Sequence, residues 1–132
     1  MNNEQHLQNA NRLILLTGAT GYVGARLLRA LEQQALQVRC LARRPEMLSG
    51  RTGARTEIVA GDALAPDSLD RALQNVDTAF YLVHSMGSAG SFEESDRQAA
   101  QNFASAAAKA GIRRIVYLGG LGDSEQRAAP AS

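Results

Sequence analysis

The sequence predicts one α/β domain built around a doubly wound parallel sheet. Apolar, strand-like runs alternate with helix-like segments along the 132 residues, and this alternation is typical of a parallel sheet with helices on both faces. The first apolar run also leads directly into a glycine-rich turn at 17–24 and then into an amphipathic helix. Because crossovers between parallel strands are right-handed, we expect about five strands in the order 3-2-1-4-5, in a three-layer αβα arrangement.

The individual elements follow from periodicity and from the residues that punctuate them. Four consecutive apolar residues, Leu13 to Leu16, predict a strand that is buried on both faces. Pro66 and Asp67 suit the first turn of a helix, and Gly111 suits the end of the long Ala-rich one. We expect strands at 12–17, 37–41, 57–60, 78–83 and 114–118, and helices at 22–34, 66–74 and 92–110.

The remaining segments are expected to be irregular. Residues 42–55 hold at most a short helix near 45–49 and cover one sheet face thinly, so that side is predicted to be mobile without a ligand. Residues 84–91 form a Gly/Ser loop. We divide the chain into a disordered lead (1–11), one domain (12–122) and a loose tail (123–132).

Composition excludes several functional classes. Hydrophobic residues make up 45% and charged residues 20% of a chain of net charge +1, which gives no reason to expect nucleic acid or a membrane surface as a partner. The polar residues 1–11 resemble neither a signal peptide nor an anchor, so a cytoplasmic location is expected. Cys40 is the only cysteine and alternates with Val38, which indicates a small buried side chain. We assign no metal site.

The glycine-rich turn is the main functional signal. Gly18 allows a tight exit from the strand, Gly21 lets a pyrophosphate approach the backbone, and Gly24 lets the helix lie close to the strand. Amides at the positive end of the helix would then point at the phosphates. This is the start of a Rossmann-type dinucleotide-binding unit, although a strand–helix turn that binds nothing has the same pattern. The predicted loop residues are Gly18, Thr20, Gly21, Tyr22, Val23 and Gly24.

The end of the second strand predicts which dinucleotide is bound. An acid there would bind the ribose 2′-hydroxyl of NAD, but this chain offers Arg43 and Arg44, and no acid precedes Glu46. Guanidinium groups favour a 2′-phosphate through bidentate contacts. The sequence therefore predicts NADP(H), with NAD the weaker candidate; the alternative is that both arginines are solvated loop charges.

Other candidates follow strands three and four. Asp62, beside Ala63, could accept the exocyclic amino group of adenine, or could serve only as a turn residue. Val83 would lie on the adenosine side of the cleft, and His84 could reach the nicotinamide ribose or be structural. The amide of Asn102, in the long helix, could bond to a neighbouring loop.

These residues together resemble the short-chain dehydrogenase/reductase superfamily, and in particular its atypical NmrA-like and nucleoside-diphosphate-sugar-epimerase-like group of NAD(P)-binding proteins. The Thr-Gly-x-x-Gly-x-x-Gly spacing at 17–24 carries the superfamily resemblance, and the segment 81–87 is similar to a signature of one bacterial subgroup. The likeness continues through 96–103, 110–112 and 115–118, and so covers about residues 12–122.

Two departures from the family pattern bear on function. Active members use a Tyr-x-x-x-Lys pair, whereas the one lysine here, Lys109, has Ser105 four residues before it. Gly119-Gly120 stands where a serine is expected after strand five. Relatives also continue beyond strand five, so we expect that this chain is truncated, with a minimal cofactor-binding domain as the alternative. Strand five would then be an open edge, and copies could associate through 114–118.

Two functional classes remain open. One is the NADP(H)-binding part of an oxidoreductase or epimerase-like enzyme, with no catalytic residue assigned. The other is a non-catalytic, NmrA-like module that senses the redox state of the dinucleotide. A phosphate-only fold is disfavoured because no Gly-Lys-Ser/Thr follows the glycines, and S-adenosylmethionine would favour an acid after strand two.

Overall fold

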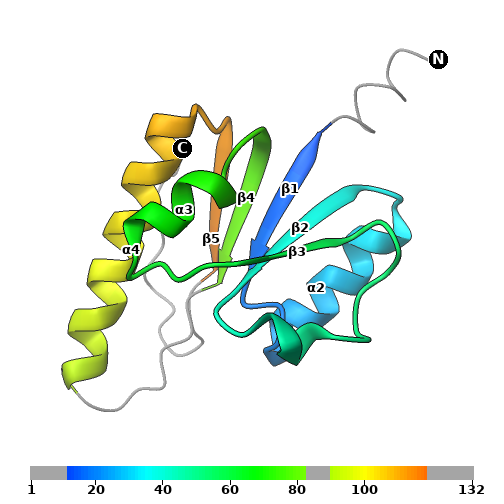
Figure 1. Cartoon of the computed structure of the whole chain (residues 1–132), viewed down its shortest axis with the longest axis horizontal. Coiled ribbons are helices and arrows are strands. Elements are labelled where there is room, and N and C mark those ends of the chain that lie inside the picture. The colour runs from blue at the N-terminus through cyan, green and yellow to red at the C-terminus, as the bar shows by residue number, and fades with distance from the viewer. Residues whose placement is uncertain (1–11, 83–89, 119–132) are drawn as a thin grey trace.

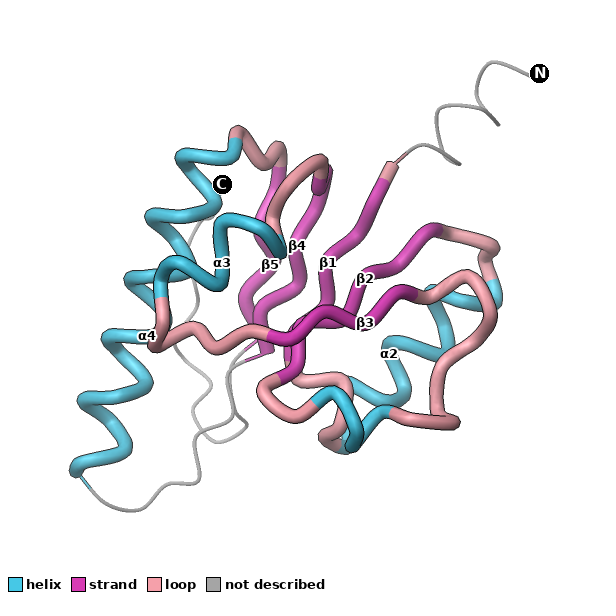
Figure 2. Tube along the Cα trace, viewed as in Figure 1, coloured by secondary structure: helices cyan, strands magenta, loops and turns pink. Residues whose placement is uncertain are grey.

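A computed structural model describes residues 12–82 and 90–118 as one twisted parallel sheet with helices on both faces (Figures 1 and 2). The strand order is β3-β2-β1-β4-β5. This confirms the predicted fold class and topology. The strands are β1 (Leu13–Thr17), β2 (Gln37–Ala42), β3 (Glu57–Ala60), β4 (Val76–Leu82) and β5 (Arg114–Leu118).

The helices form two layers around the sheet. Helix α2 (Tyr22–Gln33) and the short 3-10 helix η1 (Pro45–Leu48) lie on one face, while α3 (Pro66–Ala72) and α4 (Gly90–Ala110) lie on the other (Figure 1). Successive side chains of β1 point to opposite layers, so Ile14 and Leu16 join the α2 core and Leu15 joins the α3/α4 core. All three are buried, as the continuous apolar run predicts.

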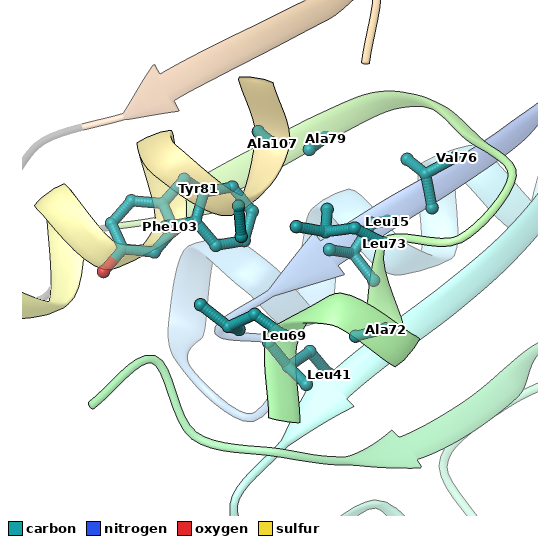
Figure 3. Packing of buried hydrophobic residues seen from close by; sticks show 11 residues of the cluster. Leu15, Leu41, Leu69, Ala72, Leu73, Val76, Ala79, Tyr81, Phe103 and Ala107 are labelled. Atoms are coloured by element: carbon teal, nitrogen blue, oxygen red, sulfur yellow. The ribbon is translucent and has the colours of Figure 1, made fainter. Parts of the chain in front are cut away.

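The α3/α4 core is the larger of the two and includes an aromatic pair. Tyr81 of β4 and Phe103 of α4 stack with ring centroids 4.6 Å apart, in the same cluster as Leu69 of α3 and Leu73, the residue that follows α3 (Figure 3). Tyr117 of β5 meets Tyr81 edge-on at 5.8 Å. The long helix is therefore fixed to the rest of the domain by apolar contacts of its C-terminal half, from Ala100 to Ala107.

Some element boundaries differ from the prediction. Strand β4 begins at Val76 rather than residue 78, because a bulge opposite Leu13 and Ile14 lets pairing start earlier. Helix α3 ends at Ala72 instead of 74, since Asn75 adopts a left-handed conformation and Arg39 donates to the carbonyls of Ala72 and Gln74. Helix α4 already includes residues 90 and 91 of the predicted Gly/Ser loop, as small residues are common at helix starts.

The segment between β2 and β3 is irregular, as predicted, but it is attached at two points. Leu48 is only 1% exposed and belongs to the α2 core. Near the other end, the Glu32 carboxylate accepts hydrogen bonds from the amide of Gly53 at 2.7 Å and the hydroxyl of Thr56 at 2.5 Å. Mobility of this segment without a ligand stays a prediction.

In the described residues, β5 pairs only with β4. Its Tyr117 and Leu118 are more than a third exposed. Association of copies through 114–118 stays a prediction, which light scattering at high protein concentration would test. Across the ranges 12–82 and 90–118, no helix has the length and apolar character needed to cross a bilayer.

Candidate functional site

The predicted site residues follow the carboxyl ends of three neighbouring strands. Because β1, β2 and β3 are parallel and adjacent, the turns that follow them lie along one edge of the sheet. In Figure 1 the turns after β1 and β2 lie in the lower part of the view, and the loop after β3 runs from the end of that strand to the left, toward α3. The amide of Gly61 donates to the carbonyl of Ala42 at 3.0 Å, which holds the ends of β2 and β3 together. The fold therefore brings the glycine turn, the Arg43–Arg44 pair and the Asp62 loop to one place.

The glycine turn after β1 is shaped by steric necessity. Gly18 has a φ of +78°, which L side chains rarely adopt. A Cβ at Gly24 would lie 1.8 Å from the Gly18 carbonyl oxygen, so only glycine allows the helix to approach the turn this closely. The amide of Gly21 donates to the same carbonyl at 3.0 Å and closes the turn.

The start of α2 fits a dinucleotide pyrophosphate. Its N-cap is Gly21, and among the described residues no side chain caps it and no acidic residue stands in the first turn. The first-turn amides are thus left for an anion, which the positive end of the helix dipole favours. Among the residues that the structure describes, a Cβ at Gly21 would meet only the Gly18 oxygen, at 3.5 Å, so none of them fills the space above this residue.

Three other residues of the turn are exposed. Thr20 is exposed, and Tyr22 and Val23 are 72% and 57% exposed, a high value for apolar side chains. The guanidinium carbon of Arg26 lies 3.8 Å from the centroid of the Tyr22 ring, so a cation stacks on this side chain one turn into the helix. The edge of the sheet thus presents both apolar surface and positive charge beside the turn.

Arg43 and Arg44 directly follow β2, and both are exposed. The first acid after them, Glu46, lies in η1. The sequence already shows that basic rather than acidic residues follow β2. The structure adds that both arginine side chains are accessible to solvent at this edge of the sheet. Whether they bind a phosphate stays a prediction.

Asp62 and Ala63 are half-buried in the loop after β3. One carboxylate oxygen of Asp62, Oδ1, accepts from the amide of Leu64 at 2.9 Å, so the turn role weighed from the sequence is present. The amide of Asn102 on α4 donates to the Ala63 carbonyl at 2.8 Å, which confirms that this side chain bonds to a neighbouring loop.

Sequence reasoning missed Thr17, the last residue of β1. Its hydroxyl donates to the carbonyl of Phe80 at 3.3 Å and accepts from the amide of Leu82 at 3.1 Å. Among the described residues, Thr17 is the one polar or charged residue that is buried, at 8% exposure. A threonine that ends an apolar strand just before a glycine turn is the signal that could have pointed to this role.

The titratable groups near the core are held in their neutral forms. Burial, with a smaller contribution from Glu32, raises the pKa of the Cys40 thiol from 9.0 to about 12. This describes an inert, buried thiol. Burial also raises the pKa of Tyr81, reinforced by Asp96, Tyr117 and Asp62, and burial raises that of Tyr117. Both phenols therefore stay protonated near neutral pH.

Lys109 lies away from the site. It stands in the last turn of α4, which leads into the amino end of β5, and its ammonium is 3.9 Å from the Asp70 carboxylate. The carboxyl-end loops that form the site are at the opposite edge of the sheet. The predicted positions Val83 and His84 lie outside the described residues. In 12–82 and 90–118, no three His, Cys, Asp or Glu side chains gather as metal ligands would.

Comparison with known proteins decides the family. A sequence model of the NAD(P)H-binding family matches residues 18–132. The chain belongs to this NAD(P)H-binding family. Its structural neighbours place the family domain in the short-chain dehydrogenase/reductase and NmrA-like Rossmann superfamily, so the resemblance inferred from the glycine motif is confirmed.

Relatives of the NAD(P)H-binding domain are reductases and dehydrogenases. The domain is 42% identical over 106 residues to (4-alkanoyl-5-oxo-2,5-dihydrofuran-3-yl)methyl phosphate reductase of Streptomyces griseus, covering 80% of this chain and 34% of that protein. It is 32% identical to ceramide reductase of Caulobacter vibrioides, over 82% of this chain and 35% of the relative. The chain thus spans about a third of the length of the curated relatives it matches.

Solved structures give the same picture. Triphenylmethane reductase of Citrobacter, in complex with NADP(H), matches with a TM-score of 0.69 and 26% identity, over 79% of this chain and 36% of that one. A short-chain dehydrogenase/reductase superfamily protein of Agrobacterium tumefaciens with bound NAD matches with a TM-score of 0.65 and 28% identity, over 80% and 32%. The chain is therefore an NAD(P)-binding domain that is similar to the corresponding domains of reductases and dehydrogenases.

Proposed function

We propose that this chain is the NADP(H)-binding part of an atypical short-chain dehydrogenase/reductase-like oxidoreductase or epimerase. The observation that carries the choice of NADP(H) is the Arg43–Arg44 pair, exposed at the carboxyl end of β2 beside the glycine turn. Two guanidinium groups at this position would bind a 2′-phosphate, and no carboxylate stands between the end of β2 and Glu46 to repel it. The complex of triphenylmethane reductase with NADP(H) supports this choice, whereas the Agrobacterium protein with NAD represents the alternative.

The remaining contacts follow from the same edge of the sheet. First-turn amides of α2, at Tyr22 and Val23, would hold the pyrophosphate, and Gly21 would leave room for it. The carboxylate of Asp62 would accept the amino group of adenine, and Ala63 would border the ring. Val83 and His84 would continue the site toward the nicotinamide. Substrate and proton donor would come from parts of the protein that these residues do not include.

Calorimetric titration of the purified chain with NADPH and NADH tests the proposal. We expect tighter binding of NADPH, and in Arg43→Ala we expect its affinity to fall about ten- to a hundredfold, toward that of NADH, because one charge-assisted contact is lost. Arg51→Ala removes an exposed arginine of the same segment and serves as the matched control, with little change expected. Absence of binding to both dinucleotides would refute the proposal, and equal loss in Arg43→Ala for both would refute the role of Arg43.

A second candidate is a non-catalytic, redox-sensing dinucleotide-binding module. The observation that agrees with it is that, within residues 1–132, the one lysine, Lys109, lies at the edge of the sheet opposite the site, so this domain by itself brings no lysine to the glycine turn. A lysine that lowers the pKa of a catalytic tyrosine must stand beside it in the site. Hydride transfer from NADPH to carbonyl substrates by the full-length protein would support the enzyme, whereas tight binding without turnover would support the sensor.

A further inference from the structure

One hydrogen bond joins α4 to the loop after β3. Asn102 is half-buried, and its Nδ2 donates to the Ala63 carbonyl at 2.8 Å although the two residues are 39 positions apart. Its Oδ1 accepts from Nε2 of Gln98, one turn earlier on the helix, at 3.0 Å. The second bond fixes the rotation of the amide, so that the nitrogen faces the loop.

The same loop is held from α3 by a second side chain. The hydroxyl of Ser68 accepts from the amide of Asp62 at 2.9 Å, and it lies 3.0 Å from the Asp62 carbonyl and 2.7 Å from that of Ala65. Asp62 also accepts through Oδ1 from Leu64. Main chain and carboxylate of Asp62 are therefore both oriented, and among the described residues no donor is bonded to its other oxygen, Oδ2.

Packing of α4 does not by itself call for an asparagine. The helix is fixed to α3 and the sheet by Phe103, Ala106 and Ala107, which are buried in the same apolar core as Leu69 and Leu73. Asparagine is a poorer helix former than leucine or alanine. What Asn102 adds that a leucine would not is its bond to Ala63 and the exposed bond from Gln98 that orients its amide.

We propose that Asn102 is a positioning residue for adenine recognition. By holding the Ala63 carbonyl it keeps the Asp62 carboxylate where the exocyclic amino group of adenine would donate to it. This inference rests on the proposed function. The proposal predicts that a residue of α4 affects which purine base is preferred, although α4 follows β4 and the loop that would contact the adenine follows β3.

The test compares NADPH with its hypoxanthine analogue, reduced nicotinamide hypoxanthine dinucleotide phosphate, which lacks the exocyclic amino group. We expect the unaltered chain to prefer NADPH roughly five- to tenfold, because one hydrogen bond distinguishes the ligands. In Asn102→Leu the preference should fall to about twofold or less. If Asn102 had only a structural role, its loss would lower the affinity for both ligands by the same factor and leave their affinity ratio unchanged.

Further variants keep the inference falsifiable. Asn102→Asp keeps the shape of the side chain but cannot donate to a carbonyl when ionised, so it should lose the preference as Asn102→Leu does. Ser105→Ala, an exposed change one turn along the same helix, should retain it. If NADPH binds but the ratio is the same in the unaltered chain and both Asn102 variants, this inference fails while the proposed function stands. If neither NADPH nor NADH binds, both fail.

Discussion

The turn after β1 and the segment after β2 reach the same edge of the sheet, but they are determined in different ways. In the turn after β1, the backbone of Gly18 and the absent side chain of Gly24 are required by the fold itself. In the segment after β2, Arg43 and Arg44 are exposed, and the chain is attached through Leu48 and through the bonds to Glu32.

This difference shows why the roles of two parts of one site cannot be predicted equally well from a sequence. A position that only glycine can occupy indicates the local geometry directly, because any other residue would clash. An exposed arginine indicates only a positive charge, since a solvated loop without a ligand accommodates an arginine equally well. The role of the first region can be tested by stability, and that of the second by binding.

The largest expected effect is on the turn after β1. Gly24→Ala places a methyl group 1.8 Å from the Gly18 carbonyl oxygen, and backbone cannot yield as a flexible side chain would. We expect the free energy of unfolding to fall by more than about 3 kcal/mol, measured by urea denaturation. A loss below about 1 kcal/mol would mean that the helix and turn can separate at little cost.

The attachment of the segment after β2 should be the next in size. Leu48→Ala removes a side chain that is 1% exposed, and we expect a loss of about 2–3 kcal/mol because the short η1 turn can partly relax into the cavity. Met47→Ala, an exposed neighbour in the same turn, is the matched control and should cost little. Equal effects of the two changes would show that η1 does not seal the core.

The pH dependence of stability tests the burial of Cys40 on β2, which lies in the core that α2 and η1 cover. Its pKa is raised in the folded state from 9.0 to about 12, so the unfolded chain loses this proton first. Between about pH 9 and pH 12 the free energy of unfolding should therefore fall by about 1.4 kcal/mol per pH unit more than in Cys40→Ala, and below pH 9 the difference should be constant. Parallel pH profiles of the two proteins would show that the thiol is accessible in the folded state.

The smallest effect on stability, with a clear effect on binding, is expected at Gly21. In Gly21→Ala the new methyl group would lie 3.5 Å from the Gly18 oxygen, an ordinary contact, and the φ of −83° suits alanine. We expect the free energy of unfolding to change by less than about 0.5 kcal/mol. NADPH affinity should fall at least about tenfold, because the methyl group would occupy the space that the pyrophosphate needs. Unchanged affinity would show that the phosphates do not approach this residue.

The order of strands and most element positions could be predicted because they depend on local signals. Continuous apolar runs mark β1 and β4, and Gly111 marks the end of α4. The early start of β4 could not be predicted, since a bulge depends on which residues of β1 lie opposite. The end of α3 was missed for a similar reason, because Arg39 reaches it from another strand.

The same division holds within the candidate site. Gly18 and Gly24 could be assigned from their spacing, and the steric contacts of both agree with the roles inferred. The bonds of Ser68 and Asn102 to the Asp62–Ala63 loop depend on tertiary contacts, and sequence reasoning identified only that the Asn102 amide could reach a loop. Thr17 was missed because its partners lie more than sixty positions away, on β4.

The two hydrogen bonds of Thr17 lie where β1 and β4 separate at their carboxyl ends. Backbone pairing between β1 and β4 ends at Leu16 and Phe80, and the Thr17 hydroxyl takes the place of the next rung by bonding to Phe80 and Leu82. The strands can therefore part at the point where the strand order reverses, without leaving the Leu82 amide unsatisfied. We therefore expect the separation of β1 and β4 at this end to exist before a ligand binds, because the Thr17 hydroxyl already replaces the backbone pairing there.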